Sequence, residues 1–279
     1  MARQADGAAT TDYLSVPGAS LYYEVTGSGP VLLLIPGGPA DGGIFALIVD
    51  LLAANFTVVR YDPRGFSRSR LAGPAEDVAV EVHADDAQQL LVALSSEPAS
   101  VFGSSGGAVI GLSLVERYPE LVRTLVAHEP PLRDFLPVES ARRKGIQAIY
   151  DTYLKEGTGP AFQQFAAVAG LDEPELPSEM TPEMQEAMAR LEQNTDFFFL
   201  HYLLPITGYA PDIAALQAAP SRVVVGVGEE SGGQFAHESA LGLAERLGTD
   251  AVTFPGGHAG DVSHPEAFAA KLHEVFQGI

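Results

Sequence analysis

The chain has 279 residues, a length typical of one large α/β domain or of one domain with an inserted lobe. Its 16 basic and 36 acidic residues give a formal net charge of −20, which disfavours nucleic acids and anionic membrane surfaces as partners. Cysteine is absent, which excludes disulfides, thiolate metal sites and cysteine nucleophiles. The chain begins with a short polar leader that lacks the basic region and apolar run of a signal peptide, so we expect a cytoplasmic protein.

The segments after the leader have the patterns of strands. The stretch "SLYYEVTGSGP" from Ser20 alternates and then breaks at glycine and proline, which predicts an edge strand followed by a turn. The stretch "VLLLIPGG" from Val31 is a continuous apolar run, typical of a strand that is buried on both faces. Similar runs are "FTVVRYDPRG", "ASVFGSS", "VRTLVAHEPP", "RVVVGVG" and "AVTFPGG", which begin at Phe56, Ala99, Val122, Arg222 and Ala251.

Helical patterns separate these strands, at residues 83–95, 106–117, 235–247 and 264–277. Strands and helices that alternate in this way predict an α/β fold, with a mostly parallel sheet that carries helices on both faces.

The alternation fails between residues 132 and 213. This segment has helical periodicity, an acidic composition, several prolines and the aromatic cluster "FFFLHY" at 197–202. Connections in such folds usually have about 2 to 6 residues, so we interpret the segment as an inserted helical cap. The core domain would then comprise residues 1–131 and 214–279.

A Gly-x-Ser-x-Gly pattern in "VFGSSGGAV" places Ser105 at its centre and makes Ser104 a spacer. A strand that turns abruptly into a helix lifts such a serine above the sheet and requires small neighbours, here Gly103 and Gly107. The amide of Gly106, at the start of the helix, could hold a developing oxyanion. Taken alone, the motif is a weak signal, and a glycine-rich turn that has no chemistry is the preferred interpretation.

Two further loops favour the catalytic interpretation. In "TFPGGHAGD", His258 follows the last predicted strand, and in "LIPGGP" the glycine pair Gly37 and Gly38 follows another strand. Carboxyl ends of parallel strands lie at one edge of a sheet, so His258 and Ser105 should share that edge. Gly38 would supply a second oxyanion amide, with Gly37 allowing the backbone to approach closely.

In the order of these motifs, with "YDPRGFSRS" and the inserted segment, the chain resembles the α/β-hydrolase superfamily from about residue 19 to 277. The resemblance implies an eight-stranded, mostly parallel sheet, an inserted cap and a catalytic triad in the order serine, acid, histidine. The chain departs from many members by carrying Pro36-Gly37 where they have His-Gly.

The acid is the second departure, because Ser231 stands where many members have an aspartate. Glu129, in "VAHEPP", occupies the other acid position of the superfamily, after the strand beside the elbow, as in haloalkane dehalogenases and in lactonase-like members related to fungal zearalenone lactonases. Glu129 is therefore the preferred acid, and Glu230 is the alternative. Glu229, Asp261 or the absence of an acid remain open.

Other polar groups are given structural roles. Asp62 and Arg64 are expected to brace the neck beside the oxyanion loop, and His128 is expected to pack against the core. For Phe198 and Tyr202 two interpretations stay open, as lid core or as pocket wall. No zinc-protease spacing and no dinucleotide fingerprint occur, so neither a metal nor another cofactor is expected.

The leading hypothesis is a serine hydrolase that cleaves a carboxylic ester or lactone of a small, hydrophobic, uncharged molecule. The superfamily also includes C–C bond hydrolases, thioesterases and cofactor-free oxygenases, which stay open. A ligand receptor or sequestering protein without turnover is the alternative outside the enzymes.

Overall fold

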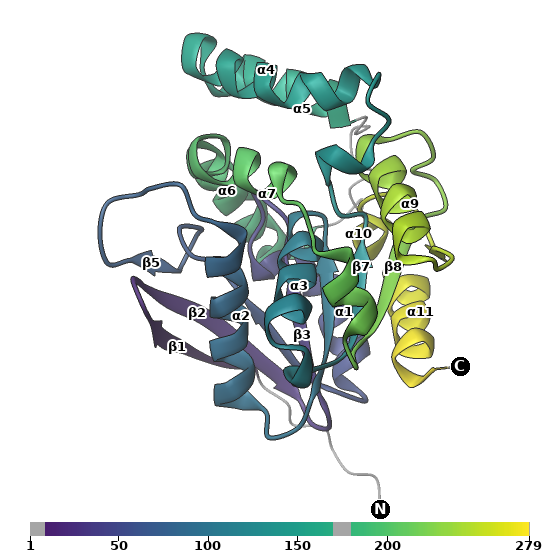
Figure 1. Cartoon of the computed structure of the whole chain (residues 1–279). Coiled ribbons are helices and arrows are strands. Elements are labelled where there is room, and N and C mark those ends of the chain that lie inside the picture. Colours follow the sequence, from purple (N-terminus) through teal and green to yellow (C-terminus); the bar gives the residue numbers. More distant parts are fainter. Residues whose placement is uncertain (1–8, 170–179, 279) are drawn as a thin grey trace, which may run out of the picture.

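The computed structural model describes residues 9–169 and 180–278, and it forms a twisted sheet with helices around it (Figure 1). The strands run in the spatial order β1-β2-β4-β3-β6-β7-β8-β9, and β5 pairs with β2. From β4 to β9 all neighbouring strands are parallel, whereas β1 and β2 are antiparallel to their neighbours. The strands are β1 Thr10–Val16, β2 Ala19–Gly27, β3 Val31–Ile35, β4 Thr57–Tyr61, β5 Arg70–Leu71, β6 Ala99–Ser104, β7 Val122–His128, β8 Arg222–Gly228 and β9 Val252–Phe254.

The α/β fold with a mostly parallel sheet is thus confirmed, and the two-residue β5 adds a ninth strand to the eight of the main path. The prediction was wrong at the amino-terminal edge. The segment described as a polar leader contains β1, so β2 is paired on both sides and is not the edge. The sequence pattern of a buried strand is absent from β1, because β1 is exposed along most of its length and shows no apolar alternation.

The helices of the core lie on both faces of the sheet. They are α1 Ala46–Ala53, α2 Val80–Leu94, α3 Gly106–Arg117, α9 Phe235–Leu247, α10 Gly260–Ser263 and α11 Pro265–Gln277. The predicted ranges 106–117 and 235–247 agree with α3 and α9, and the other two differ from α2 and α11 only at their ends.

Strand β3 shows why the central run is apolar throughout. Leu33 and Ile35 pack in one cluster with residues of α2, α3 and α9, while Leu32 and Leu34 pack in another with α1 and α11. Successive side chains of a strand point to opposite faces, so a strand between two helical layers needs apolar residues at every position. Burying each of these side chains stabilises the fold by about 1.5–3 kcal/mol.

Between β7 and β8 the chain forms a further group of helices. They are α4 Ala141–Glu156, α5 Thr158–Ala169, α6 Pro182–Phe197, the π-helical turn η4 Phe198–Tyr202, α7 Leu203–Gly208 and α8 Ile213–Ala218. Figure 1 shows α4 and α5 farthest from the sheet, with α6 and α7 beneath them. Part of the expected insertion, residues 170–179, and the first eight residues of the leader lie outside the described residues.

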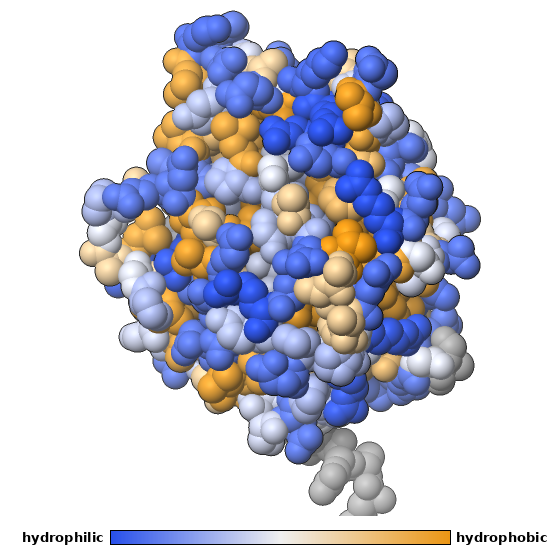
Figure 2. Space-filling model, in the orientation of Figure 1, coloured by the Kyte–Doolittle hydropathy of each residue, from blue (hydrophilic) through white to orange (hydrophobic). Residues whose placement is uncertain are grey.

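The surface is mostly polar on the face that Figure 2 shows, where hydrophobic side chains form small separate areas. In the parts of the chain that the structure describes, no helix combines the length and apolar character needed to cross a membrane.

Candidate active site

Ser105 lies in a sharp turn between β6 and α3. Its backbone has φ 54° and ψ −120°, a conformation that residues with a Cβ rarely adopt. A Cβ at Gly107 would lie 2.0 Å from the Ile35 carbonyl oxygen, and one at Gly103 would lie 2.4 Å from the Gly107 carbonyl oxygen. The two glycines are therefore needed for the turn, and they let it present the half-buried Ser105 at the end of the sheet.

The loop after β3 approaches Ser105 closely. A Cβ at Gly37 would lie 2.7 Å from the Ser105 Cβ, so only glycine fits there. Gly38 and Gly106 line the same pocket as Ser105. Within the described residues neither the Gly38 nor the Gly106 amide has a hydrogen-bond acceptor. Two free donors thus border the serine.

His258 and Glu129 are hydrogen bonded to each other. The distance from His258 Nδ1 to Glu129 Oε2 is 2.6 Å, and Glu129 is fully buried. Glu129 also has a positive φ, of 48°, which turns its side chain at the end of β7. Its other oxygen, Oε1, accepts from the Gly228 amide at 2.8 Å and from the Ser231 hydroxyl.

These contacts set the charge of Glu129. Burial by itself would raise the pKa of the carboxyl group, but the hydrogen bond and charge of His258 outweigh it and, with Ser231, lower the pKa to about 2. Glu129 is therefore a carboxylate at neutral pH, and it can hold His258 with the proton on Nδ1.

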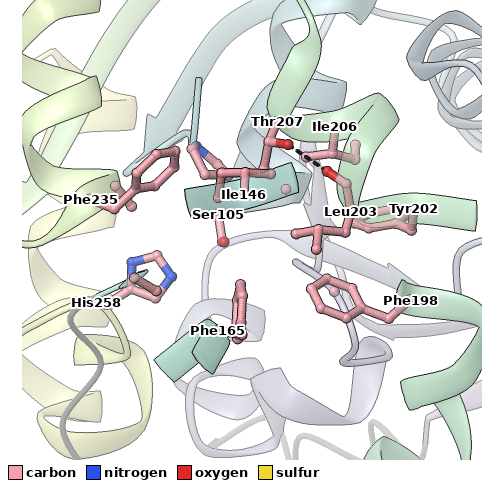
Figure 3. Close-up of a pocket in the computed structure, with 15 residues that line it drawn as sticks. Ser105, Ile146, Phe165, Phe198, Tyr202, Leu203, Ile206, Thr207, Phe235 and His258 are labelled. Carbon is pink, nitrogen blue, oxygen red and sulfur yellow. Dashed lines mark hydrogen bonds between the residues drawn. The ribbon is translucent and has the colours of Figure 1, made fainter. Parts of the chain in front are cut away.

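Ser105 and His258 line the same cavity, and Figure 3 shows the serine hydroxyl pointing into the space between the His258 ring and Phe165. Among the residues described, the side-chain hydrogen bond of His258 goes to Glu129 and not to Ser105. Catalytic hydrogen bonds are often long in a free enzyme and shorten when substrate is bound.

The alternative acids lie in other environments. Glu229 and Glu230 are exposed, and neither side chain bonds to His258 in the described structure. Asp261 is buried, and its burial raises its pKa to about 6. Ser231, at the position where an aspartate was sought, is itself buried and donates to Glu129.

Two cavities meet at Ser105 and His258. The smaller has a volume of about 40 Å³ and is lined mainly by apolar side chains, among them Phe198 and Tyr202. The larger has a volume of about 600 Å³ and is bordered by both apolar and polar groups. Phe198 and Tyr202 are also buried, so they contribute both to the packing around η4 and to the wall of the pocket.

The groups predicted to be structural are buried and packed. Asp62 accepts from Arg68 Nε at 2.7 Å and from the Gly42 amide at 3.2 Å, while Arg64 forms two bonds with Asp86, at 2.5 and 2.6 Å. His128 is 1% exposed and packs among Phe102, Phe254 and Phe268. Burial lowers the pKa of His128 to about 4, which keeps the ring neutral.

Sequence reasoning missed a second histidine beside the acid. His237, from α9, has its Nδ1 3.0 Å from Ser231 Oγ and 3.4 Å from Glu129 Oε1. No local motif marks it, because its proximity to Glu129 depends on how α9 packs against β8.

The contacts that hold α6 to the loop after β3 were also missed. Asn194 donates from Nδ2 to the Pro39 carbonyl oxygen at 2.8 Å and accepts from the Ser67 amide at 2.8 Å. Arg190 Nε donates to Asp41 Oδ2 at 2.5 Å. These partners are far apart in sequence, and only the fold brings them together.

Within residues 9–169 and 180–278, no cluster of three or more histidine, aspartate or glutamate side chains could hold a metal ion.

Comparisons with known proteins agree with the fold. A family model described as "alpha/beta hydrolase fold" matches residues 30–200. The chain is 36% identical to "Uncharacterized hydrolase YraK" of Bacillus subtilis, over 95% of each chain. It is 30% identical to "Zearalenone hydrolase" of Bionectria ochroleuca, over 96% of this chain and 98% of that protein. Among solved structures, an esterase from Exiguobacterium antarcticum superposes with a TM-score of 0.78 at 18% identity, covering 96% of this chain and 100% of the esterase.

Proposed function

Because the chain belongs to the α/β-hydrolase family, we propose that it is a serine hydrolase that cleaves a carboxylic ester or lactone of a small hydrophobic molecule. The observation that carries the proposal is the 2.6 Å hydrogen bond between His258 and the buried Glu129, beside a cavity that Ser105 also lines. A nucleophile, a base and an acid that orients the base are the parts that acyl transfer requires.

In the proposed reaction, Ser105 Oγ attacks the carbonyl carbon while His258 Nε2 takes the hydroxyl proton. The carbonyl π electrons move to the oxygen, which the Gly38 and Gly106 amides hold. When the tetrahedral intermediate collapses, the leaving alkoxide takes the proton from His258 and an acyl-enzyme remains. Water, activated by His258, then releases the acid and restores Ser105. Glu129 stays a carboxylate throughout and stabilises the imidazolium.

The substrate class rests on the lining of the site. We assign residues 132–213 as a cap whose side chains, among them Phe198 and Leu203, form the apolar wall over Ser105. Apolar walls favour an uncharged, hydrophobic substrate. The name of the fungal relative, zearalenone hydrolase, favours a lactone within this class.

A panel of aryl esters and macrolactones tests the proposal. Replacing the nucleophile in Ser105→Ala should lower kcat by about 10⁴-fold or more. The neighbouring Ser104→Ala is the matched control and should keep kcat close to that of the wild type. An aryl phosphonate should label Ser105, as identified by peptide mass spectrometry.

The opposite result would be a folded wild-type protein that binds the panel tightly, resists the phosphonate and shows the same residual turnover as Ser105→Ala. That result would identify a ligand receptor or sequestering protein instead of an enzyme.

A further inference from the structure

Tyr202 has a buried hydroxyl group that the proposed reaction has not used. The residue is 1% exposed, and in the described part of the chain its hydroxyl oxygen has no hydrogen-bond partner. An unpaired buried hydroxyl destabilises a fold, so such groups are uncommon and often serve a ligand.

The backbone around Tyr202 is unusual as well. The residue ends η4, a single turn of π-helix between α6 and α7. Such turns are rare and occur frequently at functional sites, because the extra residue changes the direction of the side chains. The ring is held in place by edge-to-face contacts with Phe66, at 5.1 Å, and with His83, at 5.3 Å between ring centres.

The Tyr202 ring lies beside both glycines whose amides border Ser105, and its hydroxyl lies beside Gly106. A Cβ built on Gly106 would lie 2.6 Å from Tyr202 Oη, and one built on Gly38 would lie 2.8 Å from Tyr202 Cε1. The tyrosine therefore fills the space that side chains at these two positions would need. Tyr202 and both glycines line the small cavity with Ser105 and His258.

We propose that Tyr202 is a catalytic residue whose hydroxyl is the third hydrogen-bond donor to the substrate carbonyl oxygen. This inference rests on the proposed function, since it assumes attack by Ser105 on a carbonyl. As the Ser105 Oγ to carbon bond forms, the π electrons move to the carbonyl oxygen and the Tyr202 O–H donates to it. No proton leaves Tyr202. When the leaving group departs, the electrons return to the carbonyl and the hydrogen bond weakens.

The surroundings suit a donor that stays neutral. Burial raises the pKa of Tyr202 well above its ordinary value, so the hydroxyl remains protonated at neutral pH and does not repel the oxyanion. With water excluded, a hydrogen bond to developing charge is stronger than it would be in solvent. The Tyr202 hydroxyl can then stabilise the transition state more than the ground state.

Tyr202→Phe is the direct test, because it removes only the hydroxyl. We expect kcat on an aryl ester to fall by about 10²- to 10³-fold with little change in KM, as when one oxyanion donor is lost. A trifluoromethyl ketone, whose adduct with Ser105 carries the oxyanion, should bind more weakly by the same factor. The melting temperature should stay equal or rise, because an unpaired buried hydroxyl has been removed.

Tyr61→Phe is the matched control. Tyr61 is also 1% exposed with an unpaired hydroxyl in the described structure, but it lies on β4 and lines neither cavity at Ser105. Its phenylalanine variant should keep the wild-type kcat and the wild-type affinity for the ketone.

Unchanged kcat and ketone affinity in Tyr202→Phe, with phosphonate labelling of Ser105 intact, would overturn the role of Tyr202 alone. A lower kcat that comes with a lower melting temperature would also overturn it, since it would indicate a structural role. Failure of the phosphonate to label Ser105 in the folded wild type would overturn the proposed function and this inference together.

Discussion

At the scale of single residues, the backbone is strained at the proposed active site. Among the described residues that are not glycine, a positive φ occurs at Ser67, Ser105 and Glu129. Two of these three are the proposed nucleophile and acid. The third, Ser67, accepts a hydrogen bond from Asn194, which also donates to the loop after β3. Strained backbone persists only where the surrounding structure holds it in place, which here is the packed end of the parallel sheet.

The first prediction concerns Glu129. In Glu129→Gln the new amide would donate to His258 Nδ1, which leaves the proton on Nε2 and prevents the ring from accepting the proton of Ser105. We expect kcat to fall by up to about 10⁴-fold. Steady-state kinetics on an aryl ester, with circular dichroism to confirm folding, measure this effect.

The alternative acid provides the comparison. Glu230→Gln should change kcat by less than about threefold, because an exposed carboxylate without a bond to His258 does not orient the ring. Near-normal turnover in Glu129→Gln together with a large loss in Glu230→Gln would move the acid to Glu230.

At the scale of elements, the contact between α3 and the segment after α7 contains a partly buried carboxyl group, and burial disfavours its charged form. Glu116, on α3, accepts from the Tyr209 hydroxyl at 2.8 Å, just after α7. Burial raises the pKa of Glu116 to about 7, although the bond from Tyr209 acts in the opposite direction. Helix α3, which begins just after the proposed nucleophile, is thus tied to Tyr209 by a group whose pKa lies near neutral pH.

The second prediction follows from this pKa. Because the folded-state pKa lies above the unfolded value, the stability that protonated Glu116 contributes is fully present below about pH 4.5 and is lost as the pH rises through about 7. The Glu116→Gln variant keeps its stability over this pH range, because the glutamine side chain does not titrate. The melting temperature of Glu116→Gln relative to the wild type should therefore increase from pH 5 to pH 8.

Differential scanning calorimetry at both pH values measures this difference. The exposed Glu120→Gln is the control and should differ from the wild type by the same amount at each pH. A difference for Glu116→Gln that is constant with pH would show that this carboxyl group does not titrate as described.

At the scale of the whole molecule, the formal charge of −20 dominates the electrostatics. Few of the 36 acidic residues belong to buried ion pairs, such as Asp86 with Arg64 and Glu24 with Arg60. The remaining carboxylates repel one another across the surface, and folding brings them closer.

The third prediction is that salt stabilises the fold. Raising sodium chloride from about 0.01 M to about 0.3 M shortens the screening length from roughly 30 Å to less than 10 Å. At pH 8 the melting temperature should rise by about 2 °C or more. At pH 5, close to the isoelectric point of 4.5, the increase should be smaller. An equal or larger increase at pH 5 would argue against charge repulsion as the cause.

The sequence by itself determined the class of fold and the edge of the sheet at which the site lies. Parallel strands need apolar residues on both faces, and their carboxyl ends share one edge, so Gly38, Ser105 and His258 could be placed there from the strand pattern alone. Strand β1 escaped prediction because its exposed residues carry no such pattern.

Only the tertiary structure decided which side chains meet at that edge. It brings Glu129, and not Glu230, to His258, because the turn at φ 48° and the small Ser231 leave room for the buried carboxylate. It also places Tyr202 beside Gly38 and Gly106. These contacts join residues from about 100 to about 160 positions apart. They depend on side-chain direction and on the packing between helices and sheet, which periodicity along the chain does not encode.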